Sequence, residues 1–251
     1  MKVLFIGNSF SVDIVEYAVD VAKNLGIEMK IGNLYFPSCS LNMHLSNITE
    51  NTAPYTYYEN DGDGWSKTPN VSIATAMKQD AWEIICIFPG TGDGSLHTTN
   101  EAYENLPKLL ERVKELALPE AKYAFPLTWI SDKDKQKKDL ALYHGDQTLV
   151  MNLIADRLRS HVIASGAFWR IIPTGTAVQH ARNAGLCITR DGYHLSYGMG
   201  RLMGALTVVG AFTDADISKA TWMPEGVTEE ERDQAIRFAQ RALLDPFTFS
   251  L

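Results

Sequence analysis

The chain of 251 residues contains few cysteines, and they are widely spaced. Its three cysteines, Cys39, Cys86 and Cys187, are an odd number without paired spacing, which excludes a disulfide framework and a zinc knuckle. Cys86 lies in an apolar run, where a buried and unreactive thiol is expected. The histidines show neither H-E-x-x-H nor Cys/His spacing. We therefore expect no metal and no cofactor.

Long hydrophobic runs and an excess of basic residues are also missing. No apolar run approaches the roughly 20 residues that a helix needs to span a bilayer. Lysine and arginine total 23 against 30 for aspartate and glutamate, so the formal charge is −7. An acidic chain without basic clusters is a poor electrostatic partner for nucleic acid or an anionic membrane. The composition therefore favours a small or neutral ligand and does not indicate an oligomeric state.

The first residues do not show the pattern of a secretory signal peptide. The apolar run Val3–Ile6 follows Lys2 directly and ends at Gly7, which is too short for a hydrophobic core and a cleavage site. On the residues present, a cytoplasmic location is expected.

Short apolar runs alternate with helical patterns along the chain. Strands are predicted at Lys2–Ile6, Ile27–Phe36, Ile84–Phe88, Tyr123–Leu127 and Phe168–Ile172. Helices are predicted at Ser11–Leu25, 98–116, 139–165, 195–212 and 227–243, the last with Thr228 and Glu231 spaced as a capping box. This alternation predicts a parallel sheet with helices on both faces.

One stretch interrupts the alternation. The aromatic run Tyr55–Tyr58 and Trp65 flank a turn rich in glycine and aspartate, which predicts a hairpin insertion near residues 52–67. Such a hairpin either walls a substrate cleft or covers an exposed edge of the core, and the sequence does not choose between these roles. Without a linker or an internal repeat, residues 1–251 are predicted to form a single domain.

A serine follows the first predicted strand directly, in the run Gly7–Ser11 (GNSFS). Ligands of open parallel sheets bind beyond the carboxyl ends of the strands. Ser9 is therefore placed to act as a nucleophile, with its own backbone N–H close to a developing oxyanion. The alternative is that Ser9 or Ser11 only caps a helix, and this motif alone favours that alternative.

A second motif lies near the other end of the chain. Asp191 and His194 are three positions apart in the run Arg190–Ser196 (RDGYHLS). A serine nucleophile needs a base, and the base needs a carboxylate to orient it. This spacing lets Asp191 hold one imidazole nitrogen while the other faces a hydroxyl. Together with Ser9, the two residues form a specific constellation.

The two motifs resemble those of the SGNH (GDSL-like) hydrolase superfamily, and more closely those of the DUF4886 family of bacterial proteins. The resemblance extends over essentially the whole chain and includes the runs GNLY at 32–35, CSL at 39–41, YTYY at 55–58, IPTGTA at 172–177 and DGYHLSY at 191–197. It implies a three-layer α/β/α sandwich with a flavodoxin-like parallel sheet of about five strands. It also implies that Ser9 is the nucleophile, His194 the base and Asp191 its orienting acid.

Two further elements of the superfamily fit this chain less closely. The superfamily takes oxyanion donors from a glycine N–H after the second strand and an asparagine side chain after the third. Here the first position is occupied by Pro37–Ser40, where the backbone N–H of Ser38 or Cys39 is the expected donor. After the third strand, the run 88–95 (FPGTGDGS) has neither Asn nor Gln, which leaves Gly90 or Thr91 as the candidate. Loss of one donor typically costs about 10²–10³ in turnover.

Other signals in the sequence are weaker. The spacing Gly90-x-Gly92-x-Gly94 matches neither common phosphate-binding motif, so nucleotide binding is a minor alternative. His44 and His97 are predicted on loops of the active face, where a structural or exposed histidine is the commoner outcome. The charged run 132–139 is expected to be a solvated loop bordering the site. The three closely spaced glycines at 198, 200 and 204 are expected to allow close helix packing.

The sequence therefore predicts a serine esterase of SGNH type that hydrolyses a small acyl ester, with carbohydrate as the favoured alcohol. The Tyr- and Trp-rich hairpin, which suits stacking on sugar rings, and the acidic charge support this substrate class. The alternative is a catalytically impaired SGNH domain that binds a carbohydrate or acyl ligand. The doubtful donor after the third strand keeps that alternative open.

Overall fold

A seven-stranded sheet with strand order β4-β3-β2-β1-β5-β6-β7 forms the centre of the molecule. The computed structural model describes residues 1–90, 98–135 and 138–250. The strands are β1 (Lys2–Gly7), β2 (Lys30–Tyr35), β3 (Tyr55–Asn60), β4 (Ser66–Val71), β5 (Ile84–Ile87), β6 (Lys122–Pro126) and β7 (Arg170–Ile172).

Five of these strands are parallel, in the order β2-β1-β5-β6-β7. This is the flavodoxin-like order, in which the chain switches from one side of β1 to the other. The switch lies between β1 and β5, so the residues after these strands occupy the place where ligands bind in such sheets. The prediction of a parallel sheet of about five strands is confirmed. β3 and β4 extend it beyond β2 by antiparallel pairing.

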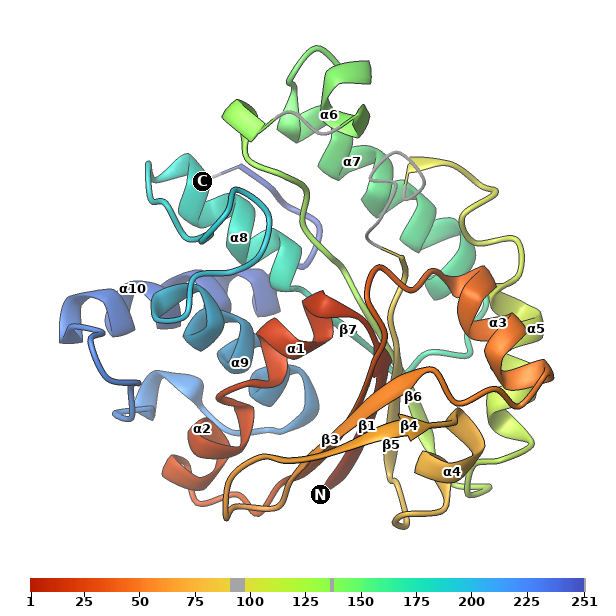
Figure 1. Ribbon diagram of the computed structural model, residues 1–251. Coiled ribbons are helices and arrows are strands. Elements are labelled where there is room, and N and C mark those ends of the chain that lie inside the picture. The colour runs from red at the N-terminus through yellow and green to blue at the C-terminus, as the bar shows by residue number, and fades with distance from the viewer. Residues whose placement is uncertain (91–97, 136–137, 251) are drawn as a thin grey trace.

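Helices lie on both faces of the sheet (Figure 1). One face carries α1 (Ser9–Val15), α2 (Ala18–Asn24), α8 (Thr174–Asn183), α9 (Met199–Phe212) and α10 (Glu229–Leu244). The other carries α3 (Leu41–Thr49), α4 (Ile73–Met77), α5 (Leu106–Lys114) and α7 (Gln147–Arg157). Shorter elements are α6 (Lys138–Leu142), 3₁₀ turns at Lys133–Lys135 and Ile217–Lys219, and a π-helical stretch at Leu158–Ile163. The predicted three-layer α/β/α sandwich is confirmed.

Side chains of β1 alternate between two cores, one on each face of the sheet. Val3 and Phe5 belong to the core beneath α1, α9 and α10, whereas Leu4 and Ile6 belong to the core beneath α3, α5 and α7. A strand that is buried on both faces reads as a continuous apolar run, as the first residues of this chain do. The position after β1 is therefore anchored from both sides.

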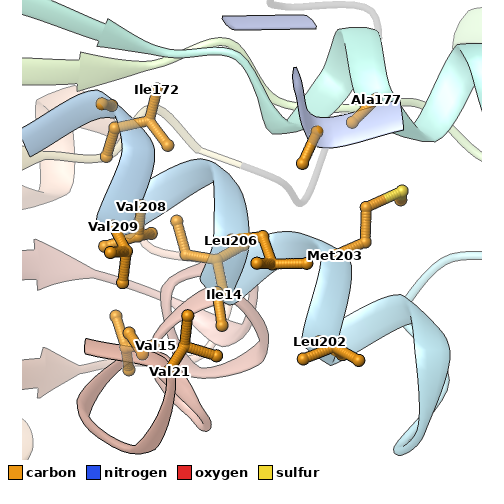
Figure 2. Close-up of a cluster of buried hydrophobic side chains, with 14 of the residues drawn as sticks. Ile14, Val15, Val21, Ile172, Ala177, Leu202, Met203, Leu206, Val208 and Val209 are labelled. Carbon is orange, nitrogen blue, oxygen red and sulfur yellow. The ribbon is translucent and has the colours of Figure 1, made fainter. Parts of the chain in front are cut away.

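The helix that follows β1 packs closely against α9. Figure 2 shows the buried side chains of this region, among them Ile14 and Val15 of α1 and Leu202, Met203, Leu206, Val208 and Val209 of α9. A Cβ atom at Gly204 would lie 3.1 Å from the Ile14 Cα, so the glycine allows this close approach, as the sequence predicted. The packing fixes α1, and with it the residues at its N-terminus.

Several helix boundaries differ from the prediction, since α5 covers only Leu106–Lys114 of the predicted 98–116 and α9 begins at Met199, and two predicted helices are divided. The segment predicted as one helix at 11–25 is divided into α1 and α2, because the indole Nε1 of Trp65 donates to the Glu16 carbonyl oxygen (3.1 Å) that a continuous helix would use internally. The segment predicted at 139–165 is divided into α6 and α7 at His144 and Gly145, which both have positive φ. The capping box of Thr228 and Glu231 at α10 is confirmed.

The aromatic segment forms the antiparallel hairpin β3–β4, and its two faces have different surroundings. Tyr55 and Tyr57 are buried on the side of α3 and α4, where they cover the edge of the core. Tyr58 and Trp65 are only partly buried and lie on the side of α1. The hairpin thus covers an edge of the core with one face, and its role in walling a substrate cleft stays a prediction. Within the described residues, no helix is long and apolar enough to cross a membrane.

Candidate active site

Ser9 is the first residue of α1 and directly follows the central strand. The N-cap is Asn8, whose Oδ1 accepts a hydrogen bond from the backbone N–H of Phe10 (3.1 Å). Since Asn8 caps the helix, Ser9 is not needed for capping and its hydroxyl is directed to another partner. The helix-capping role that was the alternative for Ser9 is therefore filled by Asn8.

The partner of Ser9 is His194, although 185 positions separate them. Ser9 Oγ lies 2.9 Å from His194 Nε2, and His194 Nδ1 lies 2.7 Å from Asp191 Oδ2. The structure thus brings the three predicted residues together in the order hydroxyl, imidazole and carboxylate. This is the order in which a base takes the proton of a serine while a carboxylate orients the ring.

The carboxylate of Asp191 also organises the loop that carries the histidine. Its Oδ1 accepts hydrogen bonds from the backbone N–H groups of Tyr193 (3.0 Å) and His194 (2.7 Å). Burial acts to raise the pKa of Asp191, but the hydrogen bonds from the His194 ring and backbone outweigh it and lower the pKa to about 2. Between these residues, Gly192 has φ +79°, a conformation that L side chains rarely adopt. Asp191 therefore remains an anion beside the imidazole.

A second buried carboxylate joins the histidine loop to α1. Asp13 is fully buried and its Oδ2 accepts the backbone N–H of Leu195 (2.9 Å). Its Oδ1 accepts from Arg190 Nη1 (2.9 Å) and Arg201 Nε (3.0 Å). A buried charge persists only when it is paired and hydrogen-bonded, and Asp13 has both kinds of partner. It therefore holds the loop of His194 against the helix of Ser9.

Aromatic rings pack around the imidazole. Phe10 stacks on Trp129 with ring centroids 4.0 Å apart, and it forms a T-shaped contact with the His194 ring, with centroids 6.1 Å apart. The Trp129 indole donates to the carbonyl oxygen of Tyr193 (2.6 Å). These contacts fix the backbone beside His194 and limit the space in which its ring can turn.

Asn8 connects the two loops that were expected to supply oxyanion donors. Its Nδ2 donates to the carbonyl oxygens of Cys39 (3.1 Å) and Pro89 (2.8 Å), which follow β2 and β5. A side-chain amide has two N–H donors, and both are used here. Asn8 therefore positions these loops and does not itself provide a donor to a bound substrate.

The loop after β2 carries two candidate oxyanion donors, the backbone N–H groups of Ser38 and Cys39, and they differ in their surroundings. The backbone N–H of Cys39 donates to the Phe36 carbonyl oxygen (3.2 Å), which occupies that donor. Ser38 is exposed and has φ +55°, unusual for a residue with a side chain. Strained backbone of this kind is often found at functional sites. Because the Cys39 N–H is occupied, Ser38 is the remaining candidate donor of the two predicted residues.

The loop after β5 is described only as far as Gly90. A Cβ atom at this position would lie 2.8 Å from both Cα and Cβ of Ser40, so the glycine lets the loops after β2 and β5 approach each other. Thr91 and His97 lie outside the described residues, as do the glycines 92 and 94 of the minor nucleotide-binding alternative. Among the predicted oxyanion residues, Ser38, Cys39 and Gly90 are thus brought to one edge of the sheet.

His44 lies in a buried cluster behind the loop after β2 and does not face a substrate. Its Nδ1 is 2.9 Å from the Tyr55 hydroxyl and 3.3 Å from Cys39 Sγ. Burial lowers the pKa of His44 to about 3 and raises the pKa of Cys39 to about 12. The cluster is therefore uncharged at neutral pH and supports the loop from below, the structural role weighed for this histidine.

Residues 132–135 of the charged run border the site, as expected, but Asp132 is not simply solvated, and residues 136 and 137 of the run lie outside the described residues. The backbone N–H of Asp132 donates to the Gly192 carbonyl oxygen (2.8 Å). Its carboxylate is 2.5 Å from the buried Arg182 and accepts from Thr189 (2.5 Å). Asp132 thus supports the triad loop at Gly192, whereas Asp13 supports it at Leu195. The described residues include no group of three His, Cys, Asp or Glu side chains that would hold a metal ion.

Two of these supporting residues were not predicted from the sequence. Asn8 lies within the predicted motif Gly7–Ser11, and its preference for the N-cap position just before a helix was the available signal. Asp13 lies between Val12 and Ile14 in an otherwise apolar helical pattern, and an acid at such a position was the available signal. Its partners lie 177 to 188 positions away, beyond the reach of any local pattern.

Comparison with known proteins places the whole chain in one family. The family model DUF4886, described as a domain of unknown function, matches residues 2–242. The crystal structure of a DUF4886 family protein from Bacteroides uniformis is similar with a TM-score of 0.92 and 31% sequence identity, covering 99% of this chain and 96% of that one. No curated protein matches the sequence.

Two more distant structures share the fold. A member of the lipolytic protein G-D-S-L family from Veillonella parvula has a TM-score of 0.56 and 16% identity, covering 85% of this chain and 99% of that one. TesA has a TM-score of 0.51 and 10% identity, covering 83% of this chain and 96% of that one. The fold is therefore that of the GDSL-like, or SGNH, hydrolases, as the resemblance in sequence implied.

Proposed function

The chain belongs to the DUF4886 family and has the fold of the SGNH hydrolases, and we propose that it is a serine ester hydrolase. The observation that carries this proposal is the arrangement of Ser9, His194 and Asp191. Ser9 Oγ lies 2.9 Å from His194 Nε2, and His194 Nδ1 lies 2.7 Å from Asp191 Oδ2. A nucleophile, a base within hydrogen-bond reach and a group that orients the base are what acyl transfer to serine requires.

The first half of the reaction transfers the acyl group to the enzyme. Ser9 Oγ attacks the ester carbonyl carbon while its proton passes to His194 Nε2. The resulting tetrahedral intermediate collapses, the ester C–O bond breaks, and His194 returns the proton to the departing alcohol. Asp191 is an anion at neutral pH, and it stabilises the His194 imidazolium that exists between the two proton transfers. Water then repeats the sequence on the acyl-enzyme, with His194 as base, and releases the carboxylic acid and free Ser9.

The oxyanion of the intermediate needs hydrogen-bond donors that are already in place. In our proposal they are the backbone N–H groups of Ser9, Ser38 and Gly90, each at the carboxyl end of a neighbouring parallel strand. Asn8 supports this role because it binds the loops after β2 and β5 simultaneously. The close approach of Gly90 to Ser40 also holds the loops after β2 and β5 next to each other.

The substrate in this proposal carries a small acyl group on a carbohydrate. The formal charge of −7 disfavours polyanions, so nucleic acid and anionic membranes are not expected partners. The aromatic side chains of the hairpin on the side of α1, Tyr58 and Trp65, supply rings that suit the faces of a sugar. A neutral glycan ester meets both conditions.

Hydrolysis of p-nitrophenyl acetate tests the proposal directly. Ser9→Ala should reduce turnover to the background rate, because no other group in the proposed mechanism forms the acyl-enzyme. Ser46→Ala, on the surface of α3, is the matched control and should hydrolyse at the wild-type rate. Equal rates for wild type and Ser9→Ala would remove Ser9 as the nucleophile.

A second candidate function rests on the loop after β5. No side-chain amide follows this strand in the sequence, and the Asn8 amide is fully used by carbonyl oxygens. Such a site would bind a carbohydrate or acyl ligand without turning it over. Failure of a fluorophosphonate to label Ser9, combined with a rise in melting temperature on adding ligand, would support this candidate. Labelling of Ser9 supports the hydrolase.

A further inference from the structure

A cavity of about 260 Å³ lies between α1 and the β3–β4 hairpin. It is lined by Val12, Val15 and Glu16 at and just beyond the end of α1, by Asn33 of β2, and by Tyr58 and Trp65 of the hairpin. Asn33 and Tyr58 are directly paired in the antiparallel register of β2 and β3, so they share one face of the sheet. The cavity is therefore formed by elements of regular structure and by the hairpin that extends the sheet.

The helix that lines this cavity also carries the proposed nucleophile. Ser9, Val12 and Glu16 are spaced i, i+3 and i+7, which places them along one face of the helix. At about 1.5 Å per residue, Val12 lies about 4.5 Å along the helix axis from Ser9. The indole of Trp65 donates to the Glu16 carbonyl oxygen (3.1 Å), which fixes the hairpin at the far end. A group bonded to an ester at Ser9 thus reaches the cavity within one or two helical turns.

The lining combines aromatic rings with strong hydrogen-bonding groups. The Glu16 carboxylate lies 3.1 Å from Arg201 Nη1, and Asn33 Oδ1 accepts from Ser11 Oγ (2.8 Å). Asn33 is buried and lies beneath the cavity, whereas the Glu16 side chain is partly exposed. An alkyl chain in this space would bury the Glu16 carboxylate against methylene groups, at a cost in free energy. A polyhydroxylated ring has apolar faces for Tyr58 and hydroxyl groups for the carboxylate.

We propose that this cavity is the sugar-binding subsite, holding one pyranose ring of the substrate with Tyr58 stacked on it and Glu16 bound to one of its hydroxyl groups. The cavity volume of about 260 Å³ is slightly below the range of about 300–1,000 Å³ that is usual for sites of drug-sized ligands. The cavity therefore suits a small ligand such as one sugar ring. The subsite deepens the proposed function and rests on it for the link to Ser9. The sugar then lies on the side of α1 and the hairpin, and the acyl group on the side of Ser38 and Gly90.

Binding of sugars that carry no ester tests the subsite apart from catalysis. The probes are the methyl glycosides of glucose, galactose and N-acetylglucosamine, titrated while the indole N–H resonance of Trp65 is followed by NMR and assigned with Trp65→Phe. At least one glycoside should shift this resonance with saturation, and Tyr58→Ala should weaken its binding about tenfold. The control is Trp169→Ala, at the β7 end of the sheet, which should bind like wild type.

Kinetics then test the link to Ser9. Tyr58→Ala should lower, about tenfold, the ratio of kcat/KM for an acetylated methyl glycoside to kcat/KM for ethyl acetate. A ratio that Tyr58→Ala leaves unchanged would overturn the subsite, as would saturable displacement of the Trp65 resonance by octanoate and by none of the glycosides. If the protein hydrolyses neither ester, the proposed function fails, while glycoside binding that depends on Tyr58 still establishes the subsite.

Discussion

Asp13 Oδ2 accepts the backbone N–H of Leu195 at 2.9 Å, and Leu195 is the residue next to His194. Asp13 itself lies one turn of α1 beyond Ser9, so a single buried carboxylate connects the helix of the nucleophile with the loop of the base. The Ser9–His194 distance therefore depends on a group that takes no part in the chemistry.

Removing the Asp13 carboxylate should destabilise the protein strongly. Asp13→Ala leaves the guanidinium groups of Arg190 and Arg201 without their buried partner, which typically costs about 3–5 kcal/mol. Asp13→Asn keeps an acceptor for Leu195 and should lose less stability. Urea denaturation gives the free energies of unfolding. Asp156→Asn, which breaks an exposed pair with Arg159, is the control and should cost less than about 1 kcal/mol.

The same variants should separate stability from reactivity. Under conditions where Asp13→Asn is still folded, fluorophosphonate should label Ser9 more slowly than in wild type, because the loop of His194 is less well held. An unchanged labelling rate in folded Asp13→Asn would show that Asp13 stabilises the fold without positioning the base.

Asp191→Asn should reduce turnover while leaving the fold intact. The amide no longer carries the charge that stabilises the imidazolium, and it can hold the ring in the wrong tautomer, a change that costs up to about 10⁴ in a serine protease triad. Because half of the Asp191 side chain is exposed, we expect a loss of roughly 10²–10⁴ in kcat. The measurement is kcat for p-nitrophenyl acetate, with circular dichroism to confirm folding. A loss below threefold would remove Asp191 from the triad.

A structural carboxylate at the other end of the sheet should give the protein a distinct acid dependence. The hydrogen bond from the Lys2 ammonium (2.6 Å), with one from Lys30, lowers the pKa of Asp80 to about 2. The folded-state pKa lies below the ordinary value of 3.8, so this stabilisation is complete above pH 4 and is lost as the pH falls from about 4 to 2.

Asp80→Asn tests this dependence. The variant should lower the free energy of unfolding by about 2 kcal/mol at pH 7, and the difference from wild type should shrink towards zero near pH 2. Urea denaturation at several pH values measures it, with Asp156→Asn again as the exposed control. A difference that is the same at pH 7 and pH 2.5 would show that Asp80 acts through packing and not through its charge.

Local sequence patterns predicted the central strands because each is a short apolar run that ends in a turn. They predicted Ser9, His194 and Asp191 as candidates because each motif is contiguous. The helices α3, α4 and α8 were not predicted. In α8, Pro173 and Gly175 interrupt the pattern, yet a Cβ atom at Gly175 would lie 2.2 Å from the Thr128 carbonyl oxygen, so packing requires the glycine.

Contacts between distant segments decided what the sequence left open. The break between α1 and α2 depends on Trp65, which lies 49 positions from the carbonyl oxygen that it binds. The choice between Ser38 and Cys39 as donor depends on a bond from Cys39 to Phe36 that exists only when the loop is folded. The role of Asp13 depends on arginines at the opposite end of the chain.

The contact between Gly90 and Ser40 tests the proposed oxyanion site. In Gly90→Ala the new Cβ atom would lie 2.8 Å from the Ser40 Cα, so one of the two loops must move. If that shift removes one donor, kcat should fall by about 10²-fold while labelling of Ser9 by fluorophosphonate is slowed and not abolished. Gly210→Ala is the matched control, because its Cβ atom would meet the side chains of Leu243 and Ile217, far from the proposed oxyanion donors, and no backbone atom. Equal loss of activity in the two variants would show a general effect on stability and would place the oxyanion donors elsewhere.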